Sequence, residues 1–259
     1  MPTTDTDPTP VHTRVLEDQD LWTLSEHVDL SATAETVRSL PADGTGLVPA
    51  LTDTATHVTY RDRSTGTDTL LPRSALGALG DAARLAAEAR RLVGAGTLTV
   101  GMIGPIPRLW WYAGVLGRAL TGITDLRLCI SRSADEDRDE RPLPRLVDQL
   151  DLAGVGLTLT DDPGAIAFGS TLVVVAAPLD LSSERIIPGA LVIEAAPGML
   201  PAEVHRRAAA VLPFGTRPAR LPADGYVVLH PADDDAGVAH RVAADLLAAG
   251  SRLGLVPPS

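Results

Sequence analysis

The sequence predicts an α/β protein with a doubly wound parallel sheet, preceded by a reduced N-terminal α+β domain. From Thr97 onward, short apolar runs alternate with helical segments. Strands that are apolar throughout and separated by helices are typical of a parallel sheet covered on both faces. Right-handed crossovers between such strands give the doubly wound arrangement. Before Thr97 the pattern is different, because helical segments there flank a few short β-rich pieces.

These patterns divide the chain into four regions. We expect a disordered tail over residues 1–14, rich in Thr, Asp and Pro, and an α+β region over 15–96. A Rossmann-like domain is expected over 97–225, and a closing strand and helix over 226–259 that return to the N-terminal region. In the N-terminal region we expect a helical stretch over 15–40, strands over 46–51, 57–60 and 69–71 with a turn at 64–66, and a helix over 81–93. The strands of the parallel sheet are expected over 98–103, 126–130, 157–160, 172–176, 191–194, 211–214 and 226–229, and its helices over 108–120, 143–152, 201–210 and 236–249.

Composition excludes several kinds of function. The chain has 22 basic and 33 acidic residues, a net charge of −11, and contains neither lysine nor asparagine. Clustered positive charge is what nucleic-acid binding requires, so we expect no nucleic-acid partner. The single cysteine, Cys129, and six dispersed histidines lack metal-ligand spacing, so no metal site is expected. With no signal-peptide pattern and no apolar run long enough to span a bilayer, the expectation is a cytoplasmic protein without a membrane partner.

The turn after the first strand of the parallel sheet is where a dinucleotide-binding fold carries its glycine-rich loop. If Gly104 is the first glycine of that loop, Ile106 takes the second place and Leu109 the third. A β-branched side chain at the second place stands where the pyrophosphate would lie. Pro105 and Pro107 also remove two N–H donors. Gly104, Pro105 and Ile106 are therefore candidate cofactor-binding residues in an altered loop.

The end of the second strand carries Ser131, Arg132 and Ser133. A site specific for NAD has Asp or Glu at this place, whereas Arg or Ser favours the 2′-phosphate of NADP. These three residues are therefore candidate contacts of NADP. The alternative is that Arg132 is a solvated residue of a highly charged loop.

The order of several segments resembles the ornithine cyclodeaminase/μ-crystallin family. The segments that carry the resemblance are the opening Val15–Leu21, the stretch from Thr65-Gly66 to Leu92, the loop Val100–Arg108, Ser131-Arg132-Ser133, Ile187-Pro188-Gly189-Ala190, and the closing 226–254. The resemblance implies NAD(P) in the Rossmann-like domain, an amino or imino acid between the two domains, and a homodimer formed through the N-terminal sheet.

The chain departs from that family at the residues on which its chemistry depends. The resemblance implies a catalytic lysine, and this sequence has none. The family's carboxylate-binding arginine falls on Gly80, and Asp81 next to it adds negative charge. The departures predict a degenerate, shortened member in which no catalytic residue can be assigned.

Trp110, Trp111 and Tyr112 follow the altered loop and hold three of the chain's eight aromatic residues. Adjacent residues on a helix project about 100° apart, so all three are not expected to face one core. Since aromatic residues are enriched in interface cores, the three residues are the candidate contact for a partner.

Two functions of different classes follow. The sequence favours a non-catalytic binding or scaffold protein, without cofactor, that recognises a peptide or protein partner in a bacterial biosynthetic pathway. The alternative is an NADP-dependent oxidoreductase, an imine or amino-acid reductase or dehydrogenase, with a modified phosphate loop.

Overall fold

The computed structural model describes residues 13–39, 51–61, 67–93, 96–131, 142–216, 221–231 and 236–254. Its larger sheet has seven strands, and every neighbouring pair is parallel. From one edge to the other the strands are β10 (Ala210–Pro213), β11 (Val227–His230), β9 (Leu191–Glu194), β8 (Leu172–Val175), β5 (Leu98–Gly104), β6 (Ile123–Ile130) and β7 (Gly156–Thr160). The order reverses at β5, which lies between β6 and β8. The predicted doubly wound parallel sheet is thus confirmed.

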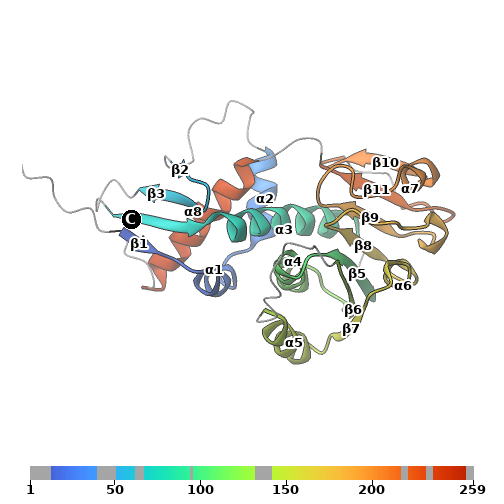
Figure 1. Cartoon of the computed structure of the whole chain (residues 1–259), viewed down its shortest axis with the longest axis horizontal. Helices are drawn as coiled ribbons and strands as arrows, with labels where there is room; N and C mark the ends of the chain where they lie inside the picture. The colour runs from blue at the N-terminus through green and yellow to red at the C-terminus, as the bar shows by residue number, and fades with distance from the viewer. Residues whose placement is uncertain are drawn as a thin grey trace, which may run out of the picture.

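Helices cover both faces of this sheet (Figure 1). The helices are α4 (Ile106–Ala119), α5 (Pro142–Ala153), α6 (Pro163–Ala167) and α7 (Ala202–Arg207), with a 3-10 turn at Ser183–Arg185. The strands are apolar because both faces are buried: all four residues of β8 are buried, as are all four of β9. The helix predicted over 201–210 is shorter, because the chain becomes extended at Ala208 and then forms β10.

The smaller sheet has four strands. Its order is β1 (Thr13–Val15), β4 (Asp68–Pro72), β3 (His57–Arg61) and β2 (Leu51–Asp53). β1 is parallel to β4, and β3 is antiparallel to both β2 and β4. Thr13 and Arg14 correct the boundary of the predicted tail, because they pair with Asp68 and Thr69 in this sheet. The rest of that tail, the turn predicted at 64–66, and all but the last residue of the strand predicted over 46–51 lie outside the described residues.

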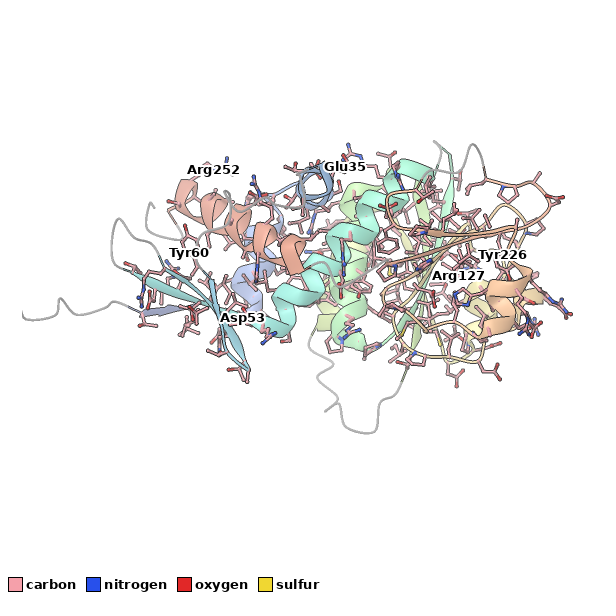
Figure 2. All side chains as sticks on the ribbon, turned by 90° about the horizontal axis from the view of Figure 1, so that it is seen from above. Glu35, Asp53, Tyr60, Arg127, Tyr226 and Arg252 are labelled. Atoms are coloured by element: carbon pink, nitrogen blue, oxygen red, sulfur yellow. The ribbon has the colours of Figure 1, made fainter. Side chains whose placement is uncertain are left out.

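Helix α3 (Arg73–Leu92) runs from the small sheet to the large one (Figure 1). Its 20 residues make a rod about 30 Å long. Figure 2 shows Asp53 and Tyr60 of the small sheet at one end of this rod. Arg127 of the large sheet and Tyr226, which directly precedes β11, lie toward the other end. The predicted helix over 81–93 therefore begins eight residues earlier, directly after β4.

Three other helices pack along α3. They are α2 (Leu30–Ser39), α4 and α8 (Ala236–Arg252), while α1 (Asp18–Ser25) contacts α8. A glycine at position 80 favours the close approach of α8, since a Cβ there would lie 3.1 Å from Cα and Cβ of Ala239 and would push the two helices slightly apart. The C-terminal helix therefore packs on the N-terminal helices. The strand before it does not follow, because β11 pairs with β9 and β10 in the large sheet.

A buried ion pair fastens the far end of α3. Glu88 is 3% exposed and pairs with Arg91 one turn later. Glu88 Oε1 accepts a hydrogen bond from the Gly215 N–H at 3.0 Å, and Arg91 donates to the carbonyl oxygens of Gly215 and Thr216. The pair thus connects α3 to the segment that follows β10.

The aromatic residues of α4 contradict the sequence prediction. Trp110, Trp111 and Tyr112 are only 7%, 2% and 0% exposed. The Trp22 ring stacks on Trp110 with centroids 4.4 Å apart, and Trp111 lies 4.6 Å from Trp110. All three can be buried because α4 is enclosed by the large sheet, α3 and α1. They form an internal cluster and present no contact surface for a partner.

The tryptophan cluster fixes the size of one neighbouring residue. A Cβ on Gly114 would lie 2.0 Å from an atom of the Trp22 ring, so Gly114→Ala forces the ring out of its place. Overpacking of this kind costs about 1–3 kcal/mol, more than the gain of about 1 kcal/mol from replacing a helical glycine. We expect Gly114→Ala to lower the free energy of unfolding in urea.

Gly117 is the matched control, because it lies on the same helix, is exposed, and has no atom within 4 Å of its added Cβ. Gly117→Ala should raise the free energy of unfolding by up to about 1 kcal/mol. Similar effects of the two substitutions would contradict the described packing of Trp22.

Candidate functional site

A cavity of about 480 Å³ lies where the first turns of α3 and α4 meet α1. We call it the Arg108 pocket. It is lined by Asp18, Ala55, Arg73, Ser74, Ala75, Gly77, Ala78, Asp81, Pro107, Arg108 and Trp111. Since α4 begins directly after β5, the pocket lies beside the carboxyl end of the strand at which the sheet order reverses. Ligands of doubly wound sheets bind at this place.

Four charged side chains surround the Arg108 pocket. Arg73 donates a hydrogen bond to the Thr54 carbonyl oxygen at 2.9 Å and lies 3.7 Å from the Asp53 carboxylate. Asp81 pairs with Arg84 at 2.5 Å, and the Tyr112 hydroxyl approaches its other oxygen at 3.5 Å. The pocket therefore contains a cation and an anion that both already have partners.

The other two charged groups, Arg108 and Asp18, are less constrained. The Arg108 side chain is exposed, and no described residue forms an ion pair or hydrogen bond with its guanidinium. Partial burial raises the pKa of Asp18, and the neighbouring Glu17 raises it further. Asp18 thus holds a proton more readily than an unperturbed aspartate does.

The turn between β5 and α4 decides whether a dinucleotide fits. Gly104 meets the requirement for a first glycine, because a Cβ there would lie 2.8 Å from the Ala176 Cβ of the neighbouring strand end. The rest of the turn differs from a glycine-rich loop. Pro105 and Pro107 have no N–H, the Arg108 N–H bonds to the Pro105 carbonyl oxygen, and Leu109 is buried. Among the described residues, the Ile106 N–H is the one backbone donor of this turn without a partner. The Arg108 side chain follows Pro107 directly.

The second predicted cofactor segment is described only in part. Ser131 follows β6, and its N–H bonds to the Gly104 carbonyl oxygen at 2.9 Å, so it lies beside the altered loop. Arg132 and Ser133 lie outside the described residues, and their contact with NADP stays a prediction.

A further carboxylate at the same edge of the sheet is already occupied. Glu194 ends β9 and is 1% exposed. One of its oxygens accepts the Leu200 N–H at 2.8 Å, and the other lies 2.9 Å from His205 Nε2. Glu194 thus holds the loop after β9 against α7, and it has no free oxygen for chemistry.

The comparisons with known proteins agree with this architecture. No protein-family model matches the chain, and no curated protein matches it. Among solved structures, the crystal structure of CmnK is similar with a TM-score of 0.68 and 17% identity, over 95% of this chain and 97% of that one. An archaeal alanine dehydrogenase dimer with bound NAD gives 0.65 and 11%, over 94% and 97%. A probable ornithine cyclodeaminase from Bordetella pertussis gives 0.59 and 14%, over 96% and 100%.

The chain has the ornithine cyclodeaminase-like fold. The resemblance found in the sequence is thereby confirmed at the level of architecture. A shared fold does not test whether the chain is degenerate and shortened, so these two statements stay predictions.

Sequence reasoning missed the main charged residues of the pocket. Arg73 and Asp18 drew no attention, because nothing in their local pattern distinguishes them from surface charges. One feature of the sequence could have indicated Arg108: it is a cation at the start of a helix where two prolines remove backbone N–H donors. Gly80, expected to mark a lost arginine of the site, instead packs against Ala239, and only Asp81 beside it reaches the pocket.

In the part of the chain that the structure describes, no group of three His, Cys, Asp or Glu side chains is placed to hold a metal ion. Within the same part of the chain, no helix combines the length and apolar character needed to cross a membrane.

Tyr112 gives a test of the buried side of the pocket. Burial, and then the Asp81 charge, raise the pKa of its phenol well above the usual value. A raised pKa in the folded state means that its contribution to stability is complete below pH about 10 and is lost as pH rises toward the folded pKa. This one group should lower the free energy of unfolding by about 1.4 kcal/mol per pH unit above pH 10.

Tyr112→Phe should remove that slope. Urea unfolding at several pH values between about 9 and 11.5 measures it, with pH 7 as the reference. Parallel alkaline slopes in the two proteins would show that Tyr112 ionises freely in the folded state.

Proposed function

We propose that the chain is a nicotinamide-dinucleotide-dependent oxidoreductase that acts on a small amino or imino acid in the Arg108 pocket. The observation that carries the proposal is the position of this pocket: a cavity with two arginines and two aspartates opens where the sheet order reverses. The solved alanine dehydrogenase of the same fold, which was determined with NAD, supports the cofactor class.

Arg108 has the role of an anion-binding residue in this proposal. The turn before α4 offers few N–H donors, so backbone amides alone cannot neutralise a pyrophosphate. A guanidinium binds phosphate or carboxylate oxygens with two parallel hydrogen bonds, and that of Arg108 has no partner among the described residues. Arg108 at the first turn of α4 thus supplies the charge that the altered loop lacks.

Arg73 and Asp18 would act on the substrate. Arg73 lies at the first turn of α3. One of its five N–H donors bonds to Thr54 and another nitrogen lies 3.7 Å from the exposed Asp53 carboxylate, so the remaining donors can hold a substrate carboxylate. When bound, the nicotinamide supplies or accepts the hydride. A proton must then move to or from the substrate nitrogen. In a chain without lysine, Asp18 is suited to this because its raised pKa favours the protonated form.

Calorimetric titration of NADPH and NADH into the purified protein tests the cofactor class. We expect saturable binding of at least one of them, and Arg108→Gln should weaken it about tenfold or more, since a charge-assisted bond is lost. Arg207→Gln is the matched control, because Arg207 is an exposed arginine of α7 that pairs only with Glu184 and Glu203 among the described residues. Arg132→Ala should weaken NADPH more than NADH if Arg132 contacts the 2′-phosphate.

Turnover is measured separately, from the absorbance of reduced nicotinamide with a panel of small amino acids and the oxidised cofactor. Asp18→Asn should abolish turnover and leave cofactor binding unchanged. Absence of binding by the unaltered protein at millimolar nucleotide would overturn the proposal. It would favour the non-catalytic protein with a peptide or protein partner that the sequence suggests.

A further inference from the structure

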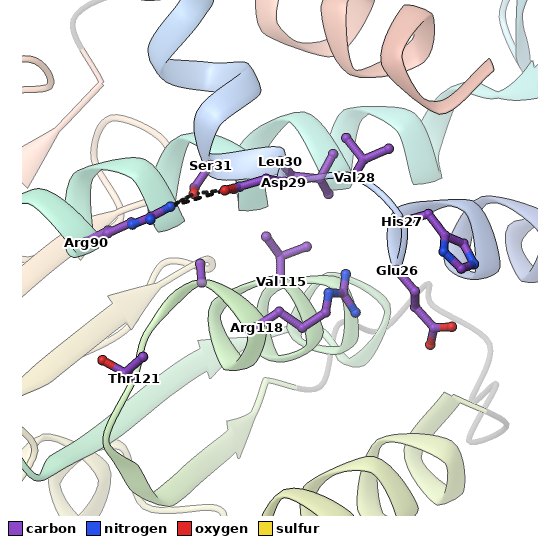
Figure 3. A pocket seen from close by; sticks show the side chains of 11 residues that line it. Glu26, His27, Val28, Asp29, Leu30, Ser31, Arg90, Val115, Arg118 and Thr121 are labelled. Atoms are coloured by element: carbon purple, nitrogen blue, oxygen red, sulfur yellow. Dashed lines mark hydrogen bonds and ion pairs between the residues drawn. The ribbon is translucent and has the colours of Figure 1, made fainter. Parts of the chain in front are cut away.

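A second cavity, of about 500 Å³, lies at the opposite ends of α3 and α4 (Figure 3). We call it the Arg118 pocket. It is lined by the turn Glu26–Ser31, by Arg90 of α3, and by Val115, Arg118, Ala119 and Thr121 of α4 and the residues after it. None of these residues lines the Arg108 pocket.

The acidic groups of the Arg118 pocket already have hydrogen-bond donors. One oxygen of Asp29 accepts from the Ser31 hydroxyl at 2.7 Å and from the Ala32 N–H at 3.1 Å, and the other lies 3.3 Å from Arg90. These donors lower the pKa of Asp29, the Ser31 hydrogen bond most of all. Glu26 accepts a hydrogen bond from the Gln149 amide at 3.1 Å. Asp29 caps the start of α2, so its charge serves the fold rather than a ligand.

Arg118, in contrast to Asp29, has no ion-pair partner among the described residues. One guanidinium nitrogen donates to the Ser25 hydroxyl at 3.1 Å, and the guanidinium carbon lies 5.3 Å from the centre of the Trp22 ring. No described carboxylate lies within ion-pair distance of it. Burial has the larger influence on Arg118 and lowers its pKa, whereas the charge of Glu26, which lies beyond ion-pair distance, raises it. The residue keeps an exposed surface toward the cavity. The stacking on Trp22 holds the planar group in place with donors unused.

Part of the remaining wall is apolar, beside the polar side chains of His27 and Thr121. Leu30 and Val115 are each 3% exposed, and Val28 is partly buried. Figure 3 shows Val115 between Arg90 and Arg118, which reach the cavity from α3 and α4 respectively. The cavity therefore combines a held cation with branched aliphatic side chains. An inorganic anion would pair with the cation but would make no use of the aliphatic side chains.

We propose that the Arg118 pocket binds a small aliphatic carboxylate, with the carboxylate on Arg118 and the hydrocarbon part against Val28, Leu30 and Val115. A guanidinium and a carboxylate match each other in bidentate geometry, and contact with the aliphatic wall removes further apolar surface from water. This site lies apart from the Arg108 pocket, so it does not depend on the proposed oxidoreductase function.

Tryptophan fluorescence provides the readout. The chain has three tryptophans, and all belong to the cluster that Trp22 connects to Arg118. Titration with isobutyrate, at constant ionic strength and without nucleotide, should change the emission saturably with a dissociation constant of about 1 mM or below. Acetate, which has a shorter hydrocarbon part, should bind more weakly. Calorimetry provides a second measurement that does not depend on the ring environment.

Arg118→Gln should weaken isobutyrate binding about tenfold or more, and Arg118→Lys should restore it only in part, because lysine lacks the planar fork. Arg90→Gln is the variant to use if both substitutions of Arg118 prevent folding, and it should weaken binding by a smaller factor. Arg207→Gln and Arg108→Gln should bind isobutyrate as the unaltered protein does.

Three results would overturn the proposal. They are the absence of a saturable change in the unaltered protein, equal binding by Arg118→Gln, and inorganic phosphate binding as tightly as isobutyrate. Because Arg108→Gln is tested in the same assay, failure here is distinguishable from failure of nucleotide binding.

Discussion

The burial of α3 is the constraint on which the rest of the structure depends. A helix about 30 Å long passes between two sheets and is enclosed by α2, α4 and α8 along its length. Twelve of its 20 residues are buried, and seven of those are alanine. Small side chains allow three helices to approach it at once, and Gly80 allows the closest approach of α8. The two sheets therefore share one hydrophobic core, although they are built from separate parts of the sequence.

The pairing of α3 with α4 also explains where both cavities lie. The two helices pack against each other, and each cavity forms at one pair of their ends. Each end carries an arginine that forms no ion pair with a described carboxylate, Arg108 at the start of α4 and Arg118 near its end, although the charge of Glu26 acts on Arg118 from a longer distance. The chain as a whole has a net charge of −11. The two arginines favour anionic ligands at two separate places.

The sequence predicted the large sheet well, because its strands are continuous apolar runs bounded by turns, a pattern with few alternatives. It failed where tertiary contacts decide the outcome. The tryptophans of α4 were expected to be partly exposed because a single helix face is about as wide as one core. In the structure, α4 is enclosed on several sides. The Trp22 ring that covers its tryptophans comes from a distant part of the sequence, so the local pattern of α4 could not indicate it. Arg73 and Asp18 could not be found for a similar reason: their meeting in one pocket follows from the packing of α1 against the start of α3.

The Glu88–Arg91 connection has a consequence for motion. It ties the last turns of α3 to the segment after β10, and breaking it would leave a buried charge unpaired, which is strongly unfavourable. The other end of α3 has no comparable fastening to the large sheet among the described contacts; Arg73 there is half-exposed and bonds only to the small sheet. If the two sheets move relative to each other, the hinge is therefore expected at the Glu88–Arg91 end of α3. The displacement is then largest at the entrance of the Arg108 pocket, so one motion would open this pocket for a ligand and close it after binding.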